Sequence, residues 1–453
     1  MRGRAGEFPL DSITVYVAGR SLARHLARQK GSAPTLVIGR DTRESGAWIE
    51  SALMAGAVSA GAKVESAGVI TTPGVAYLAR TLPADAGVVI SASHNPFEDN
   101  GIKVFAPSGR KISDTMERLI EADIAAEAED RAWAQSPGSF FEVTTLEINS
   151  SRADKLRAHY LDYLAYEIGA KLSLEGTSLV LDCANGAASE LAPKLFQKLG
   201  ARVVAINNQP DGRNINRDCG SLHIEGLQKK VREESADLGV AYDGDADRAL
   251  FVNARGHFVD GDATLWVLAQ FMQERGLLED STVVATVMSN VGLEIAMRSR
   301  GIELLRTDVG DKYVLEELLR TGATLGGEQS GHIIFPEQSL AGDGMITTLN
   351  LLRAVRETGR KLDELTAGFT RYPQILVNVR VREKRPFEDV ERIGDAAREV
   401  REKLGARGRL LLRYSGTEPL ARVMIEGELQ EEIESYAGRL AAIIRTELGE
   451  GDA

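Results

Sequence analysis

The stretch Leu238-Gly239-Val240-Ala241-Tyr242-Asp243-Gly244-Asp245-Ala246-Asp247-Arg248 joins a short apolar run to three carboxylates at alternate positions. Residues 238–241 are typical of a buried strand, and the polar cluster starts where that strand ends. Three aspartates this close repel one another unless a cation lies among them. Hard oxygen ligands suit Mg²⁺, which completes its shell with phosphate oxygens or water. The stretch therefore predicts a strand that ends in a magnesium site, rather than a solvated acidic turn.

Other short apolar runs also end in polar, turn-forming clusters. The runs 35–38, 87–90 and 178–181 lead into Gly39–Arg43, Ser91–Pro96 and Asp182–Gly186. Amphipathic helical stretches lie between them, which predicts α/β domains that bind ligands at the carboxyl ends of their strands. For Asp182–Gly186, a ligand loop and an ordinary turn are equal alternatives.

The chain of 453 residues is too long for one core, so we expect four domains. The expected boundaries are 1–151, 152–253, 254–370 and 371–453. A helix from about Arg152 to Gly169 opens the second domain, and a strand at 249–253 marks the seam to the third. An alternating strand at 375–381 and two amphipathic helices predict a smaller C-terminal α+β domain.

Composition excludes several classes of protein. The net charge of -12 argues against a nucleic-acid-binding surface. No apolar run approaches the roughly 20 residues of a membrane span, and the start of the chain lacks the apolar core of a signal peptide. Cys183 and Cys219 lie far apart without metal-type spacing, which favours two reduced thiols. We therefore expect a cytoplasmic protein with neither nucleic-acid nor membrane partners.

Three further motifs carry reactive or polar groups. Ser93 follows a strand, with His94 beside it and Lys103 ten residues on, as in a nucleophile site, but without the Gly-x-Ser-x-Gly elbow of α/β-hydrolases. The loop 326–332 combines a carboxylate, an amide, a hydroxyl and an imidazole, a set suited to sugar hydroxyls. The run 413–419, with Arg422 after it, has the arginine, hydroxyls and glycine amide of a phosphate clamp.

Together, and in this order, the four motifs resemble the α-D-phosphohexomutase family along essentially the whole chain. The resemblance implies three related α/β sheet domains and a smaller α+β domain around a central cleft. Within the family, the chain is most similar to bacterial members that act on glucosamine phosphate. The segments Val89–Phe97, Asn214–Ser221 and Gly327–His332 support this finer assignment. Gln329 matters most, because members that act on other sugars commonly carry a different residue there.

The resemblance also implies a mechanism and a set of site residues. It implies that phosphorylated Ser93 binds one Mg²⁺ together with Asp243, Asp245 and Asp247. The phosphoserine would convert glucosamine 6-phosphate and glucosamine 1-phosphate into each other through a bisphosphate, a step towards UDP-N-acetylglucosamine. The implied catalytic residues are Ser93, His94, Lys103, Arg2 and His332. The implied substrate-binding residues are Arg248, Glu328, Ser330, Arg413, Ser415, Gly416 and Thr417. We expect Gly39–Arg43 to have a supporting, mainly structural role, and the sequence leaves a homodimer open.

Three alternatives remain open at the level of sequence. The same chemistry on glucose or mannose phosphates is the nearest. A magnesium-dependent phosphatase would use an aspartyl nucleophile within 243–247. A non-catalytic sugar-phosphate-binding protein is the third.

The start of the chain departs from the family pattern. Family members open with a segment resembling Phe-Gly-Thr-Asp-Gly-Ile-Arg-Gly, in which Met1 takes the isoleucine position and Arg2 the arginine position. A free terminus frays, so we expect Arg2 to be less ordered than a catalytic arginine, and the natural polypeptide to begin several residues earlier. Asp11 is expected to cap a helix that reaches about Ala27, although residues 13–17 alone favour a strand.

Overall fold

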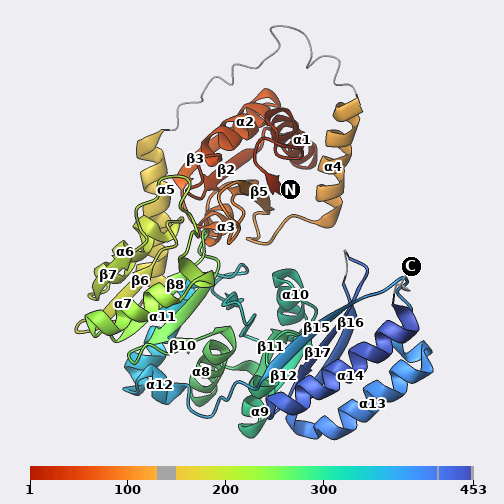
Figure 1. Ribbon diagram of the computed structural model, residues 1–453. Coiled ribbons are helices and arrows are strands. Elements are labelled where there is room, and N and C mark those ends of the chain that lie inside the picture. Colours follow the sequence, from red (N-terminus) through yellow and green to blue (C-terminus); the bar gives the residue numbers. More distant parts are fainter. Residues whose placement is uncertain (130–148, 416–417, 450–453) are drawn as a thin grey trace.

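The computed structural model describes residues 1–129, 149–415 and 418–449 (Figure 1). Within these ranges the chain forms four domains in sequence order, each built on one sheet. The turn expected at 136–138 lies outside the described residues. The four-domain α/β architecture predicted from the sequence is confirmed.

The first domain is a five-stranded mixed sheet in the order β1-β5-β4-β2-β3. Its strands are β1 (Arg2–Arg4), β2 (Thr35–Arg40), β3 (Lys63–Val69), β4 (Ala86–Ile90) and β5 (Asp99–Phe105). Its helices are α1 (Ser12–Lys30), α2 (Gly46–Ser59), α3 (Thr72–Thr81) and α4 (Asp114–Glu129). Leu36 and Ile38 of β2 enter one apolar cluster and Val37 enters another, so both faces of the sheet are covered.

Helix α1 confirms one local prediction. Asp11 is the N-cap, and its Oδ1 accepts a hydrogen bond from the Thr14 amide at 3.0 Å. Gly31 ends the helix in the left-handed region at φ 74°. Residues 13–17, which are β-branched or aromatic, therefore lie in a helix, because the cap and the burial of Val15 and Val17 outweigh their strand propensity.

The second domain has the sheet order β10-β9-β8-β6-β7. Its strands are β6 (Ser178–Asp182), β7 (Arg202–Ile206), β8 (Leu238–Tyr242), β9 (Ala249–Asn253) and β10 (Phe258–Val259). Its helices are α5 (Ser150–Asp162) with the π-helical turn η2 (Tyr163–Ile168), α6 (Ala188–Lys198), the 3-10 turn η3 (Gly220–Leu222) and α7 (Glu225–Glu234). Because β9 pairs with β8 on one side and β10 on the other, this domain continues beyond the expected boundary at 253.

The third domain has the order β12-β11-β13-β14. Its strands are β11 (Thr282–Thr286), β12 (Glu303–Thr307), β13 (Gly326–Gly327) and β14 (Ile333–Ile334). Its helices are α8 (Gly261–Glu274), η4 (Glu279–Ser281), α9 (Val291–Ser299), α10 (Asp311–Thr321), α11 (Gly344–Thr358) and α12 (Leu362–Leu365).

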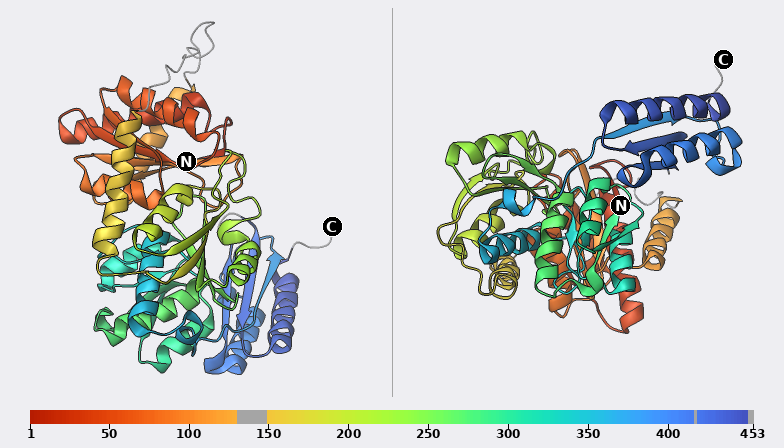
Figure 2. Two further views of the ribbon diagram at one scale, coloured as in Figure 1. Left: turned by 90° about the vertical axis from the view of Figure 1, so that its left-hand side faces the viewer. Right: turned by 90° about the horizontal axis from the view of Figure 1, so that it is seen from below.

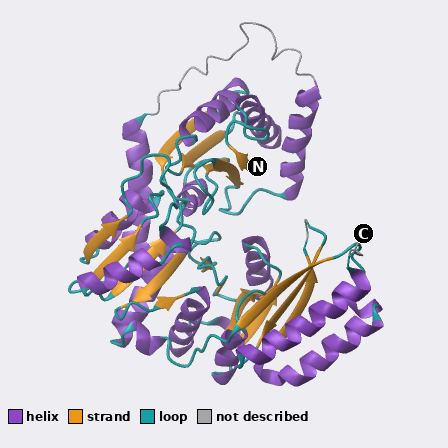
Figure 3. Cartoon of the chain, in the orientation of Figure 1, coloured by secondary structure: helices purple, strands orange, loops and turns teal. Residues whose placement is uncertain are grey.

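The fourth domain is an antiparallel sheet in the order β15-β17-β16. Its elements are β15 (Gln374–Arg380), η5 (Phe387–Asp389), α13 (Glu391–Leu404), η6 (Gly405–Arg407), β16 (Arg409–Tyr414), β17 (Leu420–Glu426) and α14 (Gln430–Leu448). Helices α13 and α14 lie together on one face of the sheet (Figure 3). The smaller α+β domain predicted at the C-terminal end is confirmed.

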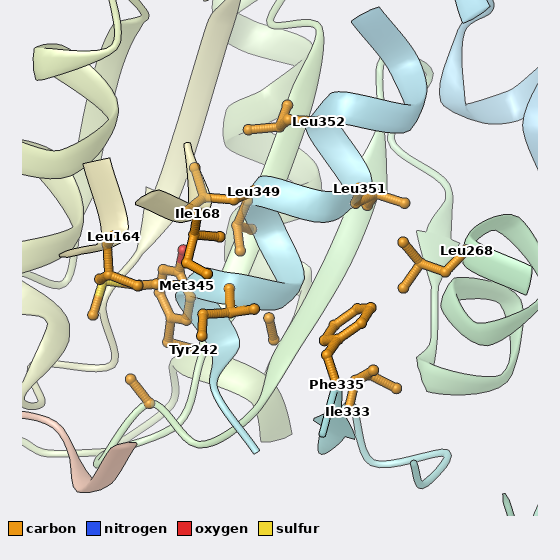
Figure 4. Packing of buried hydrophobic residues seen from close by; sticks show 14 of the residues in the cluster. Leu164, Ile168, Tyr242, Leu268, Ile333, Phe335, Met345, Leu349, Leu351 and Leu352 are labelled. Carbon is orange, nitrogen blue, oxygen red and sulfur yellow. The ribbon is translucent and has the colours of Figure 1, made fainter. Parts of the chain in front are cut away.

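Apolar packing divides the molecule unequally. One cluster of buried side chains continues from the first domain through the third; around Tyr242 it includes Ile168, Met345 and Leu349 (Figure 4). The fourth domain has a separate core, and it stands to one side of the other three (Figure 2). No helix in the described ranges is long and apolar enough to cross a membrane.

Asp262, in the first turn of α8, gives a pH-dependent stability prediction. Burial and the neighbouring Asp260 raise the pKa of Asp262 to about 7, although its carboxylate accepts a hydrogen bond from the Asn290 amide at 2.8 Å. The pKa of Asp262 in the folded protein lies above its value of about 4 in the unfolded chain. The contribution of the Asp262 carboxyl to the free energy of unfolding is therefore full below pH ~4 and is lost as the pH rises through 7. Asp262→Asn should escape this loss.

The measurement is the Tm of Asp262→Asn and of the parent between pH 5 and 8. As the pH rises, the Tm of the variant should increase relative to that of the parent. The corresponding change in the relative free energy of unfolding is on the order of 1.4 kcal/mol per pH unit at most. Asp218→Asn, at an exposed position, is the control. A Tm difference that stays constant across this range would contradict the prediction.

Candidate active site

Ser93 lies in the loop 91–98 that connects β4 to β5, here called the Ser93 loop. Its side chain is buried, and its backbone has φ 53°, in the left-handed region. Its Oγ donates a hydrogen bond to Asp243 Oδ2 at 2.5 Å and lies 3.5 Å from His94 Nδ1. The structure thus brings together a serine and an aspartate that are 150 residues apart in sequence.

The segment Asp243–Arg248, here called the metal loop, follows β8 directly. One oxygen each of Asp243, Asp245 and Asp247 lies within 4.8 Å of the others. Among the described residues, Oδ1 of Asp245 and Oδ1 of Asp247 are buried without a hydrogen-bond partner. Burial, and then the other two carboxylates, raise the pKa of Asp243 well above its usual range. Converging, unpartnered carboxylate oxygens fit a divalent cation such as Mg²⁺.

Lys103, on β5, reaches the metal loop from the first domain. Its Nζ donates to Asp245 Oδ2 at 2.7 Å and lies 3.7 Å from Asp247 Oδ2. Burial lowers the pKa of Lys103, but the two aspartates raise it by more, so the ammonium stays protonated. Lys103 therefore places a fixed positive charge beside the three carboxylates.

Two histidines next to the metal loop differ in their electrostatics. The Nδ1 of buried His332 lies 3.7 Å from Asp247 Oδ2. Burial lowers the pKa of His332, but Asp247 and Asp311 raise it by more, which favours the protonated ring. The pKa of His94 is lowered by burial and then by Arg248 and Arg2. His332 is thus the easier of the two to protonate.

Two arginines flank the same loops. The Nε of Arg248 lies 3.8 Å from Asp247 Oδ1. Arg2 donates from Nη2 to the Ala92 carbonyl and, at 2.8 Å, to Asn95 Oδ1 of the Ser93 loop. The expectation that Arg2 hangs from a fraying end is wrong, because β1 pairs with β5 and sets Arg2 opposite Gly101.

The loop expected to read sugar hydroxyls is the tight turn between β13 and β14. The Glu328 amide donates to the His332 carbonyl at 2.9 Å, and Gly331 turns the chain at φ 88°. The Ala249 amide donates to the Gly331 carbonyl at 3.1 Å, which ties this turn to the end of the metal loop. Among the described residues, Ser330 Oγ is buried without a partner. The turn therefore presents unsatisfied polar groups beside the aspartates.

The phosphate-clamp residues lie at the end of β16 in the fourth domain. Ser415 Oγ accepts a hydrogen bond from Arg422 Nη2 at 3.3 Å, and Arg413 faces Arg422 across the strand pair β16–β17. Lys384 Nζ donates to the Ser415 carbonyl at 2.6 Å. Gly416 and Thr417 lie outside the described residues. In the described part of the clamp, one arginine thus contacts the Ser415 hydroxyl, a lysine contacts the Ser415 carbonyl, and a second arginine lies on the neighbouring strand.

A cavity of about 750 Å³ lies between the first and third domains. Its lining includes Lys103, Lys111, Asp247, Asp311 and His332. In the described part of the chain, the clamp around Ser415 does not line this cavity. The expected site residues therefore form two groups. One surrounds the metal loop and lines the cavity through Lys103, Asp247 and His332, and the other lies on the fourth domain.

Sequence reasoning missed two residues near these groups. Thr72, at the start of α3, donates from Oγ1 to Asp245 Oδ2 at 2.6 Å and from its amide to the Asp245 carbonyl at 3.0 Å. Lys384 was missed as well. Neither belongs to a motif; Thr71-Thr72-Pro73, an N-terminal helix signal, was the one available hint of a helix start at the site.

The four-domain fold is that of a phosphomutase. Family models described as phosphoglucomutase/phosphomannomutase match all four domains, at residues 1–131, 158–256, 260–372 and 376–443. The chain belongs to the phosphoglucomutase/phosphomannomutase family.

Curated relatives extend over the full length. The chain is 50% identical to the phosphoglucosamine mutase of Solibacter usitatus over 450 residues, covering 99% of this chain and 98% of the relative. It is 48% identical to the phosphoglucosamine mutase of Caldicellulosiruptor saccharolyticus over 450 residues, with the same coverage.

Solved structures share the fold. A phosphoglucomutase/phosphomannomutase family protein from Burkholderia thailandensis has a TM-score of 0.77 at 24% identity, covering 98% of this chain and 96% of that one. The N-acetylphosphoglucosamine mutase of Aspergillus fumigatus, in complex with GlcNAc-6P and magnesium, has a TM-score of 0.57 at 20% identity, covering 83% of this chain and 92% of that one.

The three aspartates predict direct metal binding. Asp245→Asn removes a carboxylate charge and should weaken Mg²⁺ binding at least about tenfold, measured by titration calorimetry on the full chain. Asp218→Asn, at an exposed position of the same domain, should bind Mg²⁺ like the parent. Parent-like affinity in each of the three single Asp→Asn variants of the metal loop would mean that it is only an acidic turn.

Proposed function

We propose that this chain interconverts glucosamine 6-phosphate and glucosamine 1-phosphate through a phosphoserine at Ser93. The observation that carries the proposal is the 2.5 Å hydrogen bond from Ser93 Oγ to Asp243, one of three converging aspartates of the metal loop. The substrate is supported by the curated relatives, which are phosphoglucosamine mutases at 44–50% identity. The product would feed the synthesis of UDP-N-acetylglucosamine, in the cytoplasm, where two buried, unpaired thiols are stable.

The proposed reaction consists of two opposite phosphoryl transfers. In the first, the bond between phosphorus and Ser93 Oγ breaks and a bond to a sugar hydroxyl oxygen forms. The hydroxyl proton passes to the neutral form of His332, which is a stronger base because, despite burial, Asp247 raises its pKa. In the second, after the bisphosphate has turned over, Ser93 Oγ takes the phosphoryl group from the other sugar oxygen and the proton returns. No group is lost between substrate and product, so the net reaction is an isomerisation.

The metal loop and its cationic neighbours manage the charge of this transfer. Asp243, Asp245 and Asp247 are the proposed Mg²⁺ ligands, and bound Mg²⁺ would neutralise charge on the transferred phosphoryl group. Lys103 lies 2.7 Å from Asp245 Oδ2 and keeps its proton, so it adds a second, permanent positive charge. The triad of carboxylates can then accept an anionic phosphoserine.

Substrate binding would use both groups of site residues. Glu328 would accept hydrogen bonds from the sugar, and the Ser330 hydroxyl would donate to it. The Glu328 carboxylate would face the ammonium of the amino sugar. Arg413, Ser415, Gly416 and Thr417 would hold the phosphate that is not being transferred. In the described ranges, the Ser415 group lies outside the cavity lining. On this proposal the fourth domain moves towards the cavity to complete the site and exclude water.

Ser93→Ala tests the phosphoserine. Without the nucleophilic oxygen, turnover of glucosamine 6-phosphate should fall by about a thousandfold or more, while the Tm stays near that of the parent. Intact-mass and peptide mass spectrometry of the parent should find phosphate on residue 93 and not on an aspartate. Phosphate on Asp243 or Asp245, with hydrolysis in place of isomerisation, would instead identify a phosphatase.

Glu328→Gln tests the substrate. Losing the negative charge should reduce kcat/KM for glucosamine 6-phosphate about tenfold more than kcat/KM for glucose 6-phosphate, because only the amino sugar offers an ammonium. Glu337→Gln, at an exposed position after the same turn, is the matched control. A parent enzyme that prefers glucose or mannose phosphate over glucosamine phosphate would overturn the substrate assignment.

A further inference from the structure

Two carbonyl groups of the Ser93 loop each accept two side-chain hydrogen bonds. The Ser93 carbonyl accepts from Arg43 Nη2 at 3.0 Å and from Asn216 Nδ2 at 2.9 Å. The Asn95 carbonyl accepts from the same two atoms, at 2.8 and 3.1 Å. Arg43 belongs to the first domain and Asn216 to the second, so the loop is held from two sides. Neither carbonyl can rotate without breaking bonds to both donors.

These bonds fix a backbone conformation on which the position of Ser93 Oγ depends. A non-glycine residue at φ 53° is strained, and it persists only where its surroundings over-determine it. In this conformation Oγ lies 2.5 Å from Asp243. Rotation of the peptide groups between Ser93 and Asn95 would move Oγ away from the metal loop.

Asn216 is itself placed against the metal loop. A Cβ on Gly244 would lie 2.6 Å from the Ser93 carbonyl oxygen and 2.9 Å from Asn216 Nδ2, so the three groups meet at one point. The Asn216 backbone has φ 58°, which asparagine tolerates better than most residues, and its amide donates to the Ala184 carbonyl at 2.9 Å. The side chain therefore reaches the first domain from a fixed base in the second.

The base consists of two segments to which the proposed reaction gives no role, Asp182–Gly186 and Asn214–Ser221. The buried carboxylate of Asp182 accepts from the Ala184 amide at 2.9 Å and from the Gly220 amide at 3.0 Å. Across the domain boundary, Thr42 Oγ1 donates to the Asn185 carbonyl at 2.5 Å. These bonds hold both segments together behind Asn216.

We propose that Asn216 is a positioning residue for phosphoryl transfer. It holds the Ser93 loop of the first domain against the metal loop of the second and keeps Ser93 Oγ within hydrogen-bond distance of Asp243. The inference rests on the proposed mutase function and deepens it. The chemistry requires an amide, since one NH₂ group offers two donors to two carbonyls, whereas a carboxylate of the same shape offers none.

Two variants distinguish the effect of the Asn216 side-chain amide from the effect of the backbone conformation at this position. Asn216→Gly removes the donors and accommodates the positive φ without strain. Asn216→Asp keeps the shape but turns a carboxylate towards two carbonyl oxygens. Asp218→Gly, at an exposed position with φ 53° in the same loop, is the matched control. Each is made in the full chain and assayed with glucosamine 6-phosphate and Mg²⁺.

The expected result is a fall in kcat of about ten- to a hundredfold in both Asn216 variants, with KM within about twofold of the parent. The ³¹P resonance of the phosphoserine should broaden or shift in these variants, and Asp218→Gly should match the parent in both readouts. A merely structural Asn216 would lower Tm and leave the resonance of the folded fraction unchanged. If Asn216→Gly does not fold, Asn216→Asp decides by the same criteria.

The outcomes distinguish this inference from the proposed function. An active, Ser93-phosphorylated parent whose Asn216→Gly variant keeps its kcat within twofold and its ³¹P resonance unchanged overturns the positioning role alone. An equal loss of kcat in Asp218→Gly also overturns it, because the effect would then belong to the loop in general. A parent with neither turnover nor phosphate on residue 93 overturns the proposed function instead.

Discussion

Three carboxylates enclosed in one buried loop are the constraint around which this molecule is arranged. One oxygen of each carboxylate lies within 4.8 Å of the others, so positive charges have to offset their repulsion. Three different domains supply these charges. Lys103 belongs to the first domain, Arg248 to the second and His332 to the third. Only when these domains are docked does the loop have the electrostatic environment that makes it tolerable. The interface between domains is therefore also the site.

The sequence was most informative where chemistry and local structure coincide in a few residues. The spacing of Asp243, Asp245 and Asp247 after an apolar run predicted a buried strand and a metal-binding loop, and the strand and the convergence of the carboxylates are both present. Asp11 predicted the start of α1 against the strand propensity of the residues after it, because a capping side chain acts within one helical turn. Local interactions of this kind can be read directly from sequence.

What depends on distant segments could not be read in the same way. The extent of the second sheet was underestimated, because the pairing of β10 with β9 involves only two residues and leaves no periodic signal. The sequence suggested that Arg2 lies in a frayed terminus. Instead it belongs to β1, which pairs with β5, about a hundred residues further along the chain. Thr72 carries no motif, and its contact with Asp245 exists only after two domains have docked. In each case the missing information was a contact between parts of the chain far apart in sequence.

The apolar cluster shared by three domains has a consequence for the order in which the chain folds during synthesis. Ile168 and Tyr242 lie against Met345 and Leu349 of α11, which leave the ribosome about a hundred residues or more after them. Until α11 arrives, the second domain has a finished sheet with an uncovered apolar surface. Such a surface binds chaperones or aggregates, so the chain is exposed to misfolding until about four fifths of it has been translated, when α11 is complete.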